Sequence, residues 1–286
     1  MVDIANLLPL GLNILSAVLV LALAALGLGI IFGLMGVINT AHGAFFTIGA
    51  YSVWFFSSQT NLGFWMGLVI APIVGAVIGF VTERIVIRYM YDRLLDSILA
   101  TWGVAIVIGE LLKLIFGTTT KTVSNPLSGR VNIVGNPYPT YRIFIIFFSA
   151  AVLASIFAFV YYTNFGVRLR AVIQNPESAE LLGINQKRMY QFSFTLGTAL
   201  AALAGAAVTP FASIGPRMGL SYLLQSFFAI ILGGAGTLLG IIPGSLIVAG
   251  GANALSLSIQ PIVAQTVIFV IVIGIILVKP KGILSR

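Results

Sequence analysis

The sequence contains no cysteine and very little charge. Without cysteine, the chain can form no disulfide, use no thiolate in catalysis and bind no metal through sulfur. Charged residues make up only 8% of the 286 residues, whereas soluble domains carry roughly a quarter. Hydrophobic residues make up 59%, so a water-soluble globule would lack the polar surface that it needs. The composition therefore predicts a polytopic membrane protein.

Histidine is almost absent as well, because His42 is the only one. An intramembrane serine hydrolase would have to use His42 as its base, and no serine lies in a Gly-x-Ser-x-Gly motif. A metal site at His42 would have no second histidine, no cysteine and no carboxylate nearby in the sequence. We therefore expect neither an enzyme nor a bound metal or cofactor.

The few charges are mostly basic and lie in three groups. The net charge of +8 would suit a nucleic-acid partner, but no aromatic platform accompanies the basic residues. Loops rich in Lys and Arg stay on the cytoplasmic side of a membrane, so the groups are better explained as topology signals. We expect a lipid bilayer, and no nucleic acid, as a partner. The groups are Arg84, Arg88 and Arg93; Arg168, Arg170, Lys187 and Arg188; and Lys279, Lys281 and Arg286.

The long apolar runs predict an all-α transmembrane fold, because about 20 helical residues span the hydrocarbon core of a bilayer. We expect a single transmembrane permease domain over residues 1–286, with about 8–9 membrane segments and broken or re-entrant helices among them. The expected segments are 10–34, 41–57, 63–89, 96–117, 143–163, 191–212, 222–237, 240–257 and 261–278.

The broken helix is expected near the C-terminus. Four expected segments separate the basic group at 164–190 from the one at the C-terminus, and the two within 222–257 are short. The 36 residues of 222–257 would extend about 54 Å as helix, which is less than two crossings of about 30 Å and a turn. One element there is therefore expected to be broken or re-entrant. The same ambiguity leaves the side of the N-terminus open.

Two polar segments are expected outside the membrane, on opposite sides. Residues 118–142 form the external loop, in which the turn-rich sequences TTTK, NPLSG and GNPYP flank a strand-like run, RVNIV. Residues 164–190 form the cytoplasmic loop.

The cytoplasmic loop carries the start and stop signals of a short helix. Asn175 is a good N-cap, Pro176 suits the first helical position, and Glu177 lies in the first turn. Gly183 is placed as the C-terminal cap. These signals predict a helix of about two turns at 176–182. A helix so short is unstable alone, so it must dock against something.

Three polar side chains lie inside the first apolar region, in the stretch VINTAHG (37–43). Asn39 or Thr40 is expected to cap the helix that starts near Ala41, and His42 then falls in its first turn. One interpretation is structural, with His42 hydrogen-bonded to a neighbouring helix. The other is functional, with this helix start at the border of a permeation path.

A weak internal repeat links this region to the C-terminal half. The sequence IIFGLMG (30–36) aligns with IILGGAG (230–236), and a Gly-rich interruption lies in both regions. Paired interrupted hydrophobic segments in the two halves of a membrane protein point to a transport site. The candidate path residues from these two regions are Asn39, Thr40, His42, Gly233 and Gly236.

The motifs resemble one family of transport proteins. LGIIFGLMGVINTAHGAFFTIGAY resembles the N-terminal signature of the permease subunits of ABC importers for branched-chain amino acids and their urea- and amide-transporting relatives. GVRLRAVIQNPESAELLGIN looks like the cytoplasmic coupling loop of that family. AALAGAAV and ILGGAGTLLGIIPGSLIV resemble its later membrane segments, and KPKGIL resembles its basic C-terminal end. The resemblance covers nearly the whole chain.

The resemblance implies a transport subunit of the bacterial inner membrane, with partners. The chain has no G-x-x-x-x-G-K-[ST] phosphate loop, so ATP must be hydrolysed by other subunits. The implied partners are a second homologous permease, two cytoplasmic ATPase subunits and a periplasmic solute-binding protein. The helix at 176–182 is the expected site through which the ATPase subunits act on the permease. The implied coupling residues are Asn175, Glu177, Glu180, Leu181 and Gly183.

The solute is the least constrained part of the prediction. ATWG, with Trp102, stands where amino-acid permeases of the family tend to have ATIG, which looks more like the urea branch. Glu110 and Lys113 share a helix face, either as a structural pair or as part of the path. Because intramembrane charge is scarce, urea or a short amide is the expected solute. A branched-chain amino acid is the alternative, and an ion-coupled secondary transporter or a channel ranks below both.

Overall fold

The computed structural model describes residues 4–91, 93–133, 135–234, 237–279 and 282–283. The described part of the chain is mostly helical, as predicted. The α-helices are α1 (Ile4–Met35), α2 (His42–Ser58), α3 (Gly63–Ile85), α4 (Leu94–Phe116), α5 (Thr140–Tyr162), α6 (Asn164–Gln174), α7 (Pro176–Leu181), α8 (Gln186–Val208), α9 (Gly219–Gly233), α10 (Ile241–Ser245), α11 (Gly251–Leu255) and α12 (Pro261–Val278). The other elements are the short helices η1 (Ile87–Met90), η2 (Leu238–Gly240) and η3 (Leu246–Gly250), and the strands β1 (Arg130–Ile133) and β2 (Asn136–Pro139).

Within the described residues, seven helices are long and apolar enough to cross a membrane. One of them is the interrupted helix Leu238–Leu255, which joins η2, α10, η3 and α11. The remaining two expected segments correspond to α2, with 17 residues, and α9, with 15 residues. The predicted transmembrane fold with broken helices is confirmed, and the protein is a multi-pass membrane protein.

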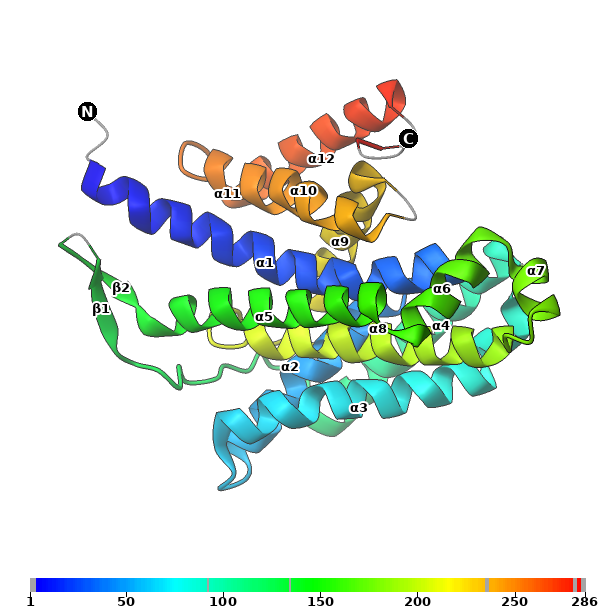
Figure 1. Cartoon of the computed structure of the whole chain (residues 1–286). Helices are drawn as coiled ribbons and strands as arrows, with labels where there is room; N and C mark the ends of the chain where they lie inside the picture. Colours follow the sequence, from blue (N-terminus) through cyan, green and yellow to red (C-terminus); the bar gives the residue numbers. More distant parts are fainter. Residues whose placement is uncertain (1–3, 92, 134, 235–236, 280–281, 284–286) are drawn as a thin grey trace.

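The two polar segments lie at opposite ends of the helical bundle (Figure 1). At one end, β1 and β2 form the antiparallel hairpin that RVNIV indicated, with Arg130 opposite Pro139. At the other end, α6 and α7 connect α5 to α8. Which end faces the cytoplasm stays a prediction from the basic residues.

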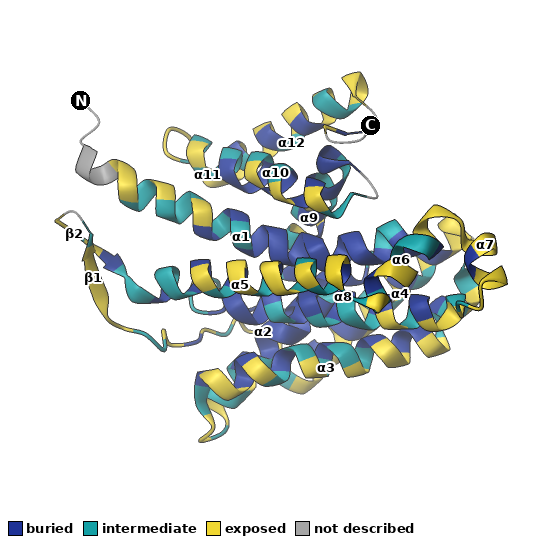
Figure 2. Ribbon diagram, viewed as in Figure 1, coloured by how far each residue is buried: buried dark blue, intermediate teal, exposed yellow. Residues whose placement is uncertain are grey.

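The centre of the bundle is formed by α1, α2 and α8, where buried residues concentrate (Figure 2). Small residues let these helices approach closely. A Cβ atom on Gly205 of α8 would lie 1.8 Å from the carbonyl oxygen of Phe46, and one on Gly49 would lie 1.8 Å from that of Ala202. Gly75 and Gly79 of α3 likewise contact α8. These small-residue faces therefore serve packing within the chain.

Helix α2 begins in the interior of the protein. The Nε2 atom of His42 lies 2.9 Å from the carbonyl oxygen of Ala24, which is in the middle of α1. From Ala24, α1 continues for about 16 Å to Met35. The non-helical residues 36–40 then lead the chain back toward the level of Ala24. Such irregular backbone is tolerated at membrane depth only where other parts of the protein satisfy its polar N–H and C=O groups.

Helix α9 also begins in the interior, directly against the start of α2. The backbone amide of Gly219 donates a hydrogen bond of 3.1 Å to the hydroxyl of Thr47. A Cβ atom on Gly43 would lie 2.5 Å from the carbonyl oxygen of Gly219, so only glycine allows this contact. The missing length within 222–257 is thus explained by α9, which starts partway through the bundle.

Candidate functional site

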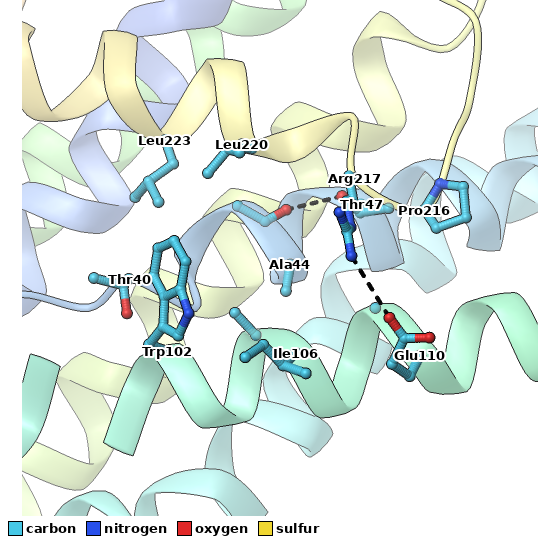
Figure 3. A pocket seen from close by; sticks show the side chains of 13 residues that line it. Thr40, Ala44, Thr47, Trp102, Ile106, Glu110, Pro216, Arg217, Leu220 and Leu223 are labelled. Carbon is cyan, nitrogen blue, oxygen red and sulfur yellow. Dashed lines mark hydrogen bonds and ion pairs between the residues drawn. The ribbon is translucent and has the colours of Figure 1, made fainter. Parts of the chain in front are cut away.

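A pocket of about 350 Å³ lies where the first turns of α2 and α9 meet one face of α4 (Figure 3). We call it the α2–α4–α9 pocket. Its wall is mostly apolar, with polar groups at a few positions. Its lining residues are Thr40, Gly43, Ala44, Thr47, Trp102, Ala105, Ile106, Gly109, Glu110, Pro216, Arg217, Leu220 and Leu223.

The VINTAHG stretch is fixed by its own polar groups. The Oδ1 atom of Asn39 accepts a hydrogen bond of 3.1 Å from the amide of Ala41, just before α2 begins. The hydroxyl of Thr40 instead lies 2.8 Å from that of Thr101 on α4. Ala41 is the N-cap of α2 and no side chain caps this helix, so the prediction that Asn39 or Thr40 caps it is wrong. Asn39 bonds the amide of the N-cap residue instead, and Thr40 joins this segment to α4.

His42 is buried behind the pocket rather than in its wall. Only 1% of its surface is exposed, and its ring contacts the backbone of α1 at Ala24. Asn39 is also fully buried and absent from the lining. Thr40 and Gly43, their immediate neighbours, do line the pocket. The geometry therefore fits both interpretations of this stretch, with a structural His42 inside a helix start that borders the pocket.

Charges of both signs meet at the mouth of the pocket. The Oε1 atom of Glu110 lies 2.6 Å from the Nζ atom of Lys113. The same oxygen lies 3.7 Å from an Nη atom of Arg217 (Figure 3). Half of the Glu110 side chain is exposed, and Arg217 is more exposed still. Glu110 lies about 9 Å along α4 from the end that leads into the external loop. Charged groups at such a depth normally face a partner or a water-filled path.

The first turns of two helices border this pocket. Gly43 and Ala44 of α2 and Leu220 of α9 are first-turn residues, and all three line it. The partial positive charge of a helix N-terminus stabilises a negatively charged group nearby. Together with Arg217, these helix ends make one side of the pocket electropositive, while Glu110 carries negative charge at its mouth.

The structure brings together some of the predicted path residues and separates others. Thr40, Trp102 and Glu110 line one pocket, as described above. Gly233 lies elsewhere, at the end of α9, where a Cβ atom would sit 2.0 Å from the carbonyl oxygen of Gly240. Gly236 lies outside the described residues.

Sequence reasoning missed Thr47, Thr101 and Arg217. Arg217 had a usable signal, because it is an isolated charge in GPRMG, between two apolar segments and flanked by glycine and proline. Thr47 and Thr101 had none, since a single threonine in an apolar helix usually bonds to its own backbone. Thr101 does so as well, with the carbonyl oxygen of Ser97 at 2.8 Å.

Helix α7 has the start and stop that the sequence predicts. The Oδ1 atom of Asn175 accepts from the amide of Ser178 at 2.9 Å, and Gly183 has φ of +81°. The amide of Ile184 donates to the carbonyl oxygen of Ala179 at 3.0 Å, which completes a Schellman-type end. Ala179 is buried, whereas Leu181 is 89% exposed. The helix thus rests on the protein by one side and presents an apolar side chain outward.

A buried carboxylate ties the α3–α4 connection to the base of α8. The hydroxyl of Tyr91 donates to Glu83, and the Nε atom of Arg88 lies 3.6 Å from the same carboxylate. The ring of Tyr91 packs on that of Tyr190 in α8, with centroids 4.8 Å apart. Burial raises the pKa of Tyr91, and the bond to Glu83 raises it further, so this hydroxyl stays protonated.

Comparison with known proteins identifies the family. Residues 10–279 match the permease component of branched-chain amino acid transport systems. The chain belongs to this permease family. It is 30% identical over 282 residues to the LivH permease protein of the high-affinity branched-chain amino acid transport system of Escherichia coli K12, covering 93% of this chain and 91% of LivH.

More distant relatives are also found. LivM, a permease protein of the same-named system in Escherichia coli K12, is 23% identical over 266 residues, covering 82% of this chain and 61% of LivM. Among solved structures, PsaBC from Streptococcus pneumoniae in complex with Fab matches with a TM-score of 0.49 and 14% identity, over 91% of this chain and 89% of the matched chain. That structural likeness is too low to inform the site. LivH and LivM are both named as permease proteins for branched-chain amino acids, so the sequence comparisons favour the amino-acid alternative and give the expected urea branch no support.

Proposed function

We propose that the protein is the membrane-spanning permease subunit of an ABC importer for branched-chain amino acids, and that the α2–α4–α9 pocket is its part of the solute path. The observation that carries the proposal is a mainly apolar pocket with Glu110 and Arg217 at its mouth. A branched-chain amino acid combines an ammonium group, a carboxylate and an alkyl chain. Glu110 complements the first, Arg217 with the two helix ends complements the second, and the apolar wall accommodates the third.

The same pocket suits urea less well. Urea is neutral and forms hydrogen bonds through every heavy atom except its carbon. The side chains of Ala44, Ile106 and Leu223 offer it no hydrogen bonds, and fixed charges of both signs have no counterpart on it. The solutes named for the relatives of this chain point in the same direction. The amino-acid alternative is therefore preferred to urea or a short amide.

The open side of the pocket indicates a second permease. Trp102, Ile106 and Glu110 on α4 are all about half exposed. Contact with lipid hydrocarbon would be energetically costly for the charged side chains of Glu110 and Arg217. A second permease subunit facing α4 would close the pocket into a path. LivH and LivM are two different permease proteins of a same-named system in Escherichia coli, and both resemble this chain, so the partner is inferred to be homologous but distinct.

The remaining partners follow from the ends of the molecule. We infer that ATPase subunits dock on α7, because this short helix has Leu181 and Glu180 exposed at the end of the bundle opposite the hairpin. A solute-binding protein would approach from the hairpin side. The inner membrane of a bacterial cell is the location that this assembly requires.

The test is transport by the reconstituted system. Proteoliposomes would contain this chain, its partner permease and the ATPases, with the binding protein added. We expect leucine uptake that requires ATP and is inhibited by isoleucine and valine but not by urea. Saturable urea uptake without leucine uptake would instead support the hypothesis that urea is the solute. Uptake of either solute without ATP would indicate a secondary transporter or a channel.

A further inference from the structure

A second cavity, of about 280 Å³, lies on the other side of α9 from the α2–α4–α9 pocket. It is bounded by α1, α5, the end of α8, α9 and the interrupted helix Leu238–Leu255. Leu220 and Leu223 of α9 line the first pocket, whereas Tyr222 and Gln225 line the second, and no lining residue is shared. We call it the Arg142 cavity, after its one charged lining residue.

Arg142 brings a positive charge that its neighbours do not neutralise. It lies in the first turn of α5, where its guanidinium donates to the Oδ1 atom of Asn13 and sits 5.0 Å from the centroid of the Phe211 ring. Tyr138 donates to the same Oδ1 atom at 3.1 Å. These neighbours are all neutral, and in the described part of the chain Arg142 makes no salt bridge. A half-buried guanidinium without a counter-ion favours an anion.

Neutral donors complete the polar side of the cavity. Gln225 is half-buried, and its amide makes no hydrogen bond with any residue that the structure describes. Asn253 donates from Nδ2 to the carbonyl oxygen of Ala249 at 2.8 Å, which leaves its second amide hydrogen for a ligand. Ala249 belongs to η3, a stretch of π-helix, and such stretches occur frequently at functional sites. Donors from two elements, α9 and α11, therefore converge with Arg142 of α5 on one cavity.

The two ends of the cavity differ in polarity. Leu21, Ile145 and Val208 are buried and line its inner part, whereas Arg142 and Gln225 are half-exposed and lie toward solvent. A ligand that fits both ends has an oxyanion attached to an apolar body. We propose that the Arg142 cavity binds the oxyanion end of such an amphiphile, either the phosphate of an anionic phospholipid or the carboxylate of an apolar amino acid.

A ligand in the Arg142 cavity would also affect the α2–α4–α9 pocket. Tyr222 lines the cavity, and its ring stacks on Phe46 of α2 at a centroid distance of 4.2 Å. The next residue, Leu223, lines the α2–α4–α9 pocket. A bound amphiphile therefore braces α9 at the point where it meets α2, so the cavity is a candidate site for control of transport by the membrane or by the solute.

The experiment measures ligand-induced stabilisation of the purified, assembled transporter in neutral detergent. Melting temperature is followed during titration with dihexanoyl phosphatidylglycerol, with dihexanoylglycerol as the matched probe without phosphate, and with leucine. We expect phosphatidylglycerol to raise the melting temperature and dihexanoylglycerol to leave it unchanged. In Arg142→Gln, the concentration for half-maximal stabilisation should rise at least tenfold. Arg93→Gln, at an exposed arginine directly before α4, should behave as the parent.

The source of the oxyanion follows from the pattern of responses. Stabilisation by leucine that persists in Glu110→Gln but is lost in Arg142→Gln would identify the carboxylate of an amino acid as the ligand. Gln225→Leu, which leaves α5 untouched, repeats the test if Arg142→Gln does not fold, and it should also weaken binding. Equal response of parent and both cavity variants to every probe would overturn the proposal. That result would leave the proposed transport function intact, because the two cavities share no residue.

Discussion

In the proposed function, Glu110 and Arg217 are the two residues on which solute recognition would depend most. They come from different elements, and their charged atoms lie 3.7 Å apart across the mouth of the α2–α4–α9 pocket. Both side chains are at least half exposed, so their mutual attraction adds little to stability. Charges that do little for the fold and face a pocket are free to bind the two charged ends of an amino acid.

Replacement of Glu110 by Gln removes the partner for the ammonium group. The KM for leucine should rise about tenfold, the equivalent of about 1.4 kcal/mol, while the melting temperature stays within about a degree of the parent. Initial rates of ATP-dependent leucine uptake in proteoliposomes measure this. Asp96→Asn is the matched control, since Asp96 lies on the same helix and pairs with Arg93 but is outside the pocket. A KM unchanged in Glu110→Gln would remove this residue from the path.

Gly205 decides how closely α8 approaches α2. Because an added Cβ atom would lie 1.8 Å from the carbonyl oxygen of Phe46, Gly205→Ala forces the two backbones apart. We expect a loss of about 1–3 kcal/mol in stability, seen as a lower melting temperature of the purified transporter. Gly274→Ala on α12, where nothing lies within 4 Å of the new Cβ atom, should leave the melting temperature unchanged. Equal melting temperatures for the two variants would mean that the contact between α2 and α8 is looser than described.

At the scale of elements, the sequence predicts what depends on local signals. The long apolar run at 261–278 coincides with α12, and the signals from Asn175 to Gly183 give α7 to within one residue. The pairing of α2 with α9 could not be predicted, because Thr47 and Gly219 are far apart in the sequence and no local signal marks their contact. No local signal marks the contact between Arg217 and Glu110 either. The sequence therefore predicted only some of the residues that line the candidate pocket.

The end of α7 offers a test of coupling at Gly183. Its φ of +81° strains any β-branched residue, whereas Asn tolerates this region. Gly183→Val should therefore lose most leucine uptake while insertion into the membrane is retained, and Gly183→Asn should keep most of it. The readout is uptake per ATP hydrolysed in proteoliposomes. Similar coupling ratios for the Val and Asn variants would show that the shape of this turn is unimportant.

The exposed side of α7 is tested separately. Glu180 and Leu181 contribute little to the fold, since both are exposed. Glu180→Lys reverses a charge on the surface proposed to bind the ATPase and should reduce solute-stimulated ATP hydrolysis at least fivefold. Tyr162→Ala, at the exposed end of α5, is a control that removes more surface from a neighbouring position without touching α7. Stimulation of the Glu180→Lys transporter equal to that of the parent would place the ATPase contact elsewhere.

At the scale of the whole molecule, exposed apolar surface must be divided between lipid and a partner. Both α4 and α12 expose large apolar side chains, so exposure alone cannot separate the two environments. Charge does separate them. The face of α4 that carries Ile106 also carries Glu110 and adjoins Arg217, whereas α12 contains no charged residue. We therefore assign the α4 face to the water-filled path and the second permease, and the α12 face to lipid.

The absence of native cysteine makes this assignment directly testable, because an introduced cysteine is the only thiol in the subunit. Ile106→Cys and Val270→Cys place it at two positions of comparable exposure, on α4 and α12. In the assembled transporter, a membrane-impermeant, water-soluble maleimide should modify the first at least tenfold faster than the second. Saturating leucine should slow only the first reaction, since Ile106 lines the pocket. Faster labelling on α12 would reverse the assignment, because water would then reach the uncharged face and lipid the charged one.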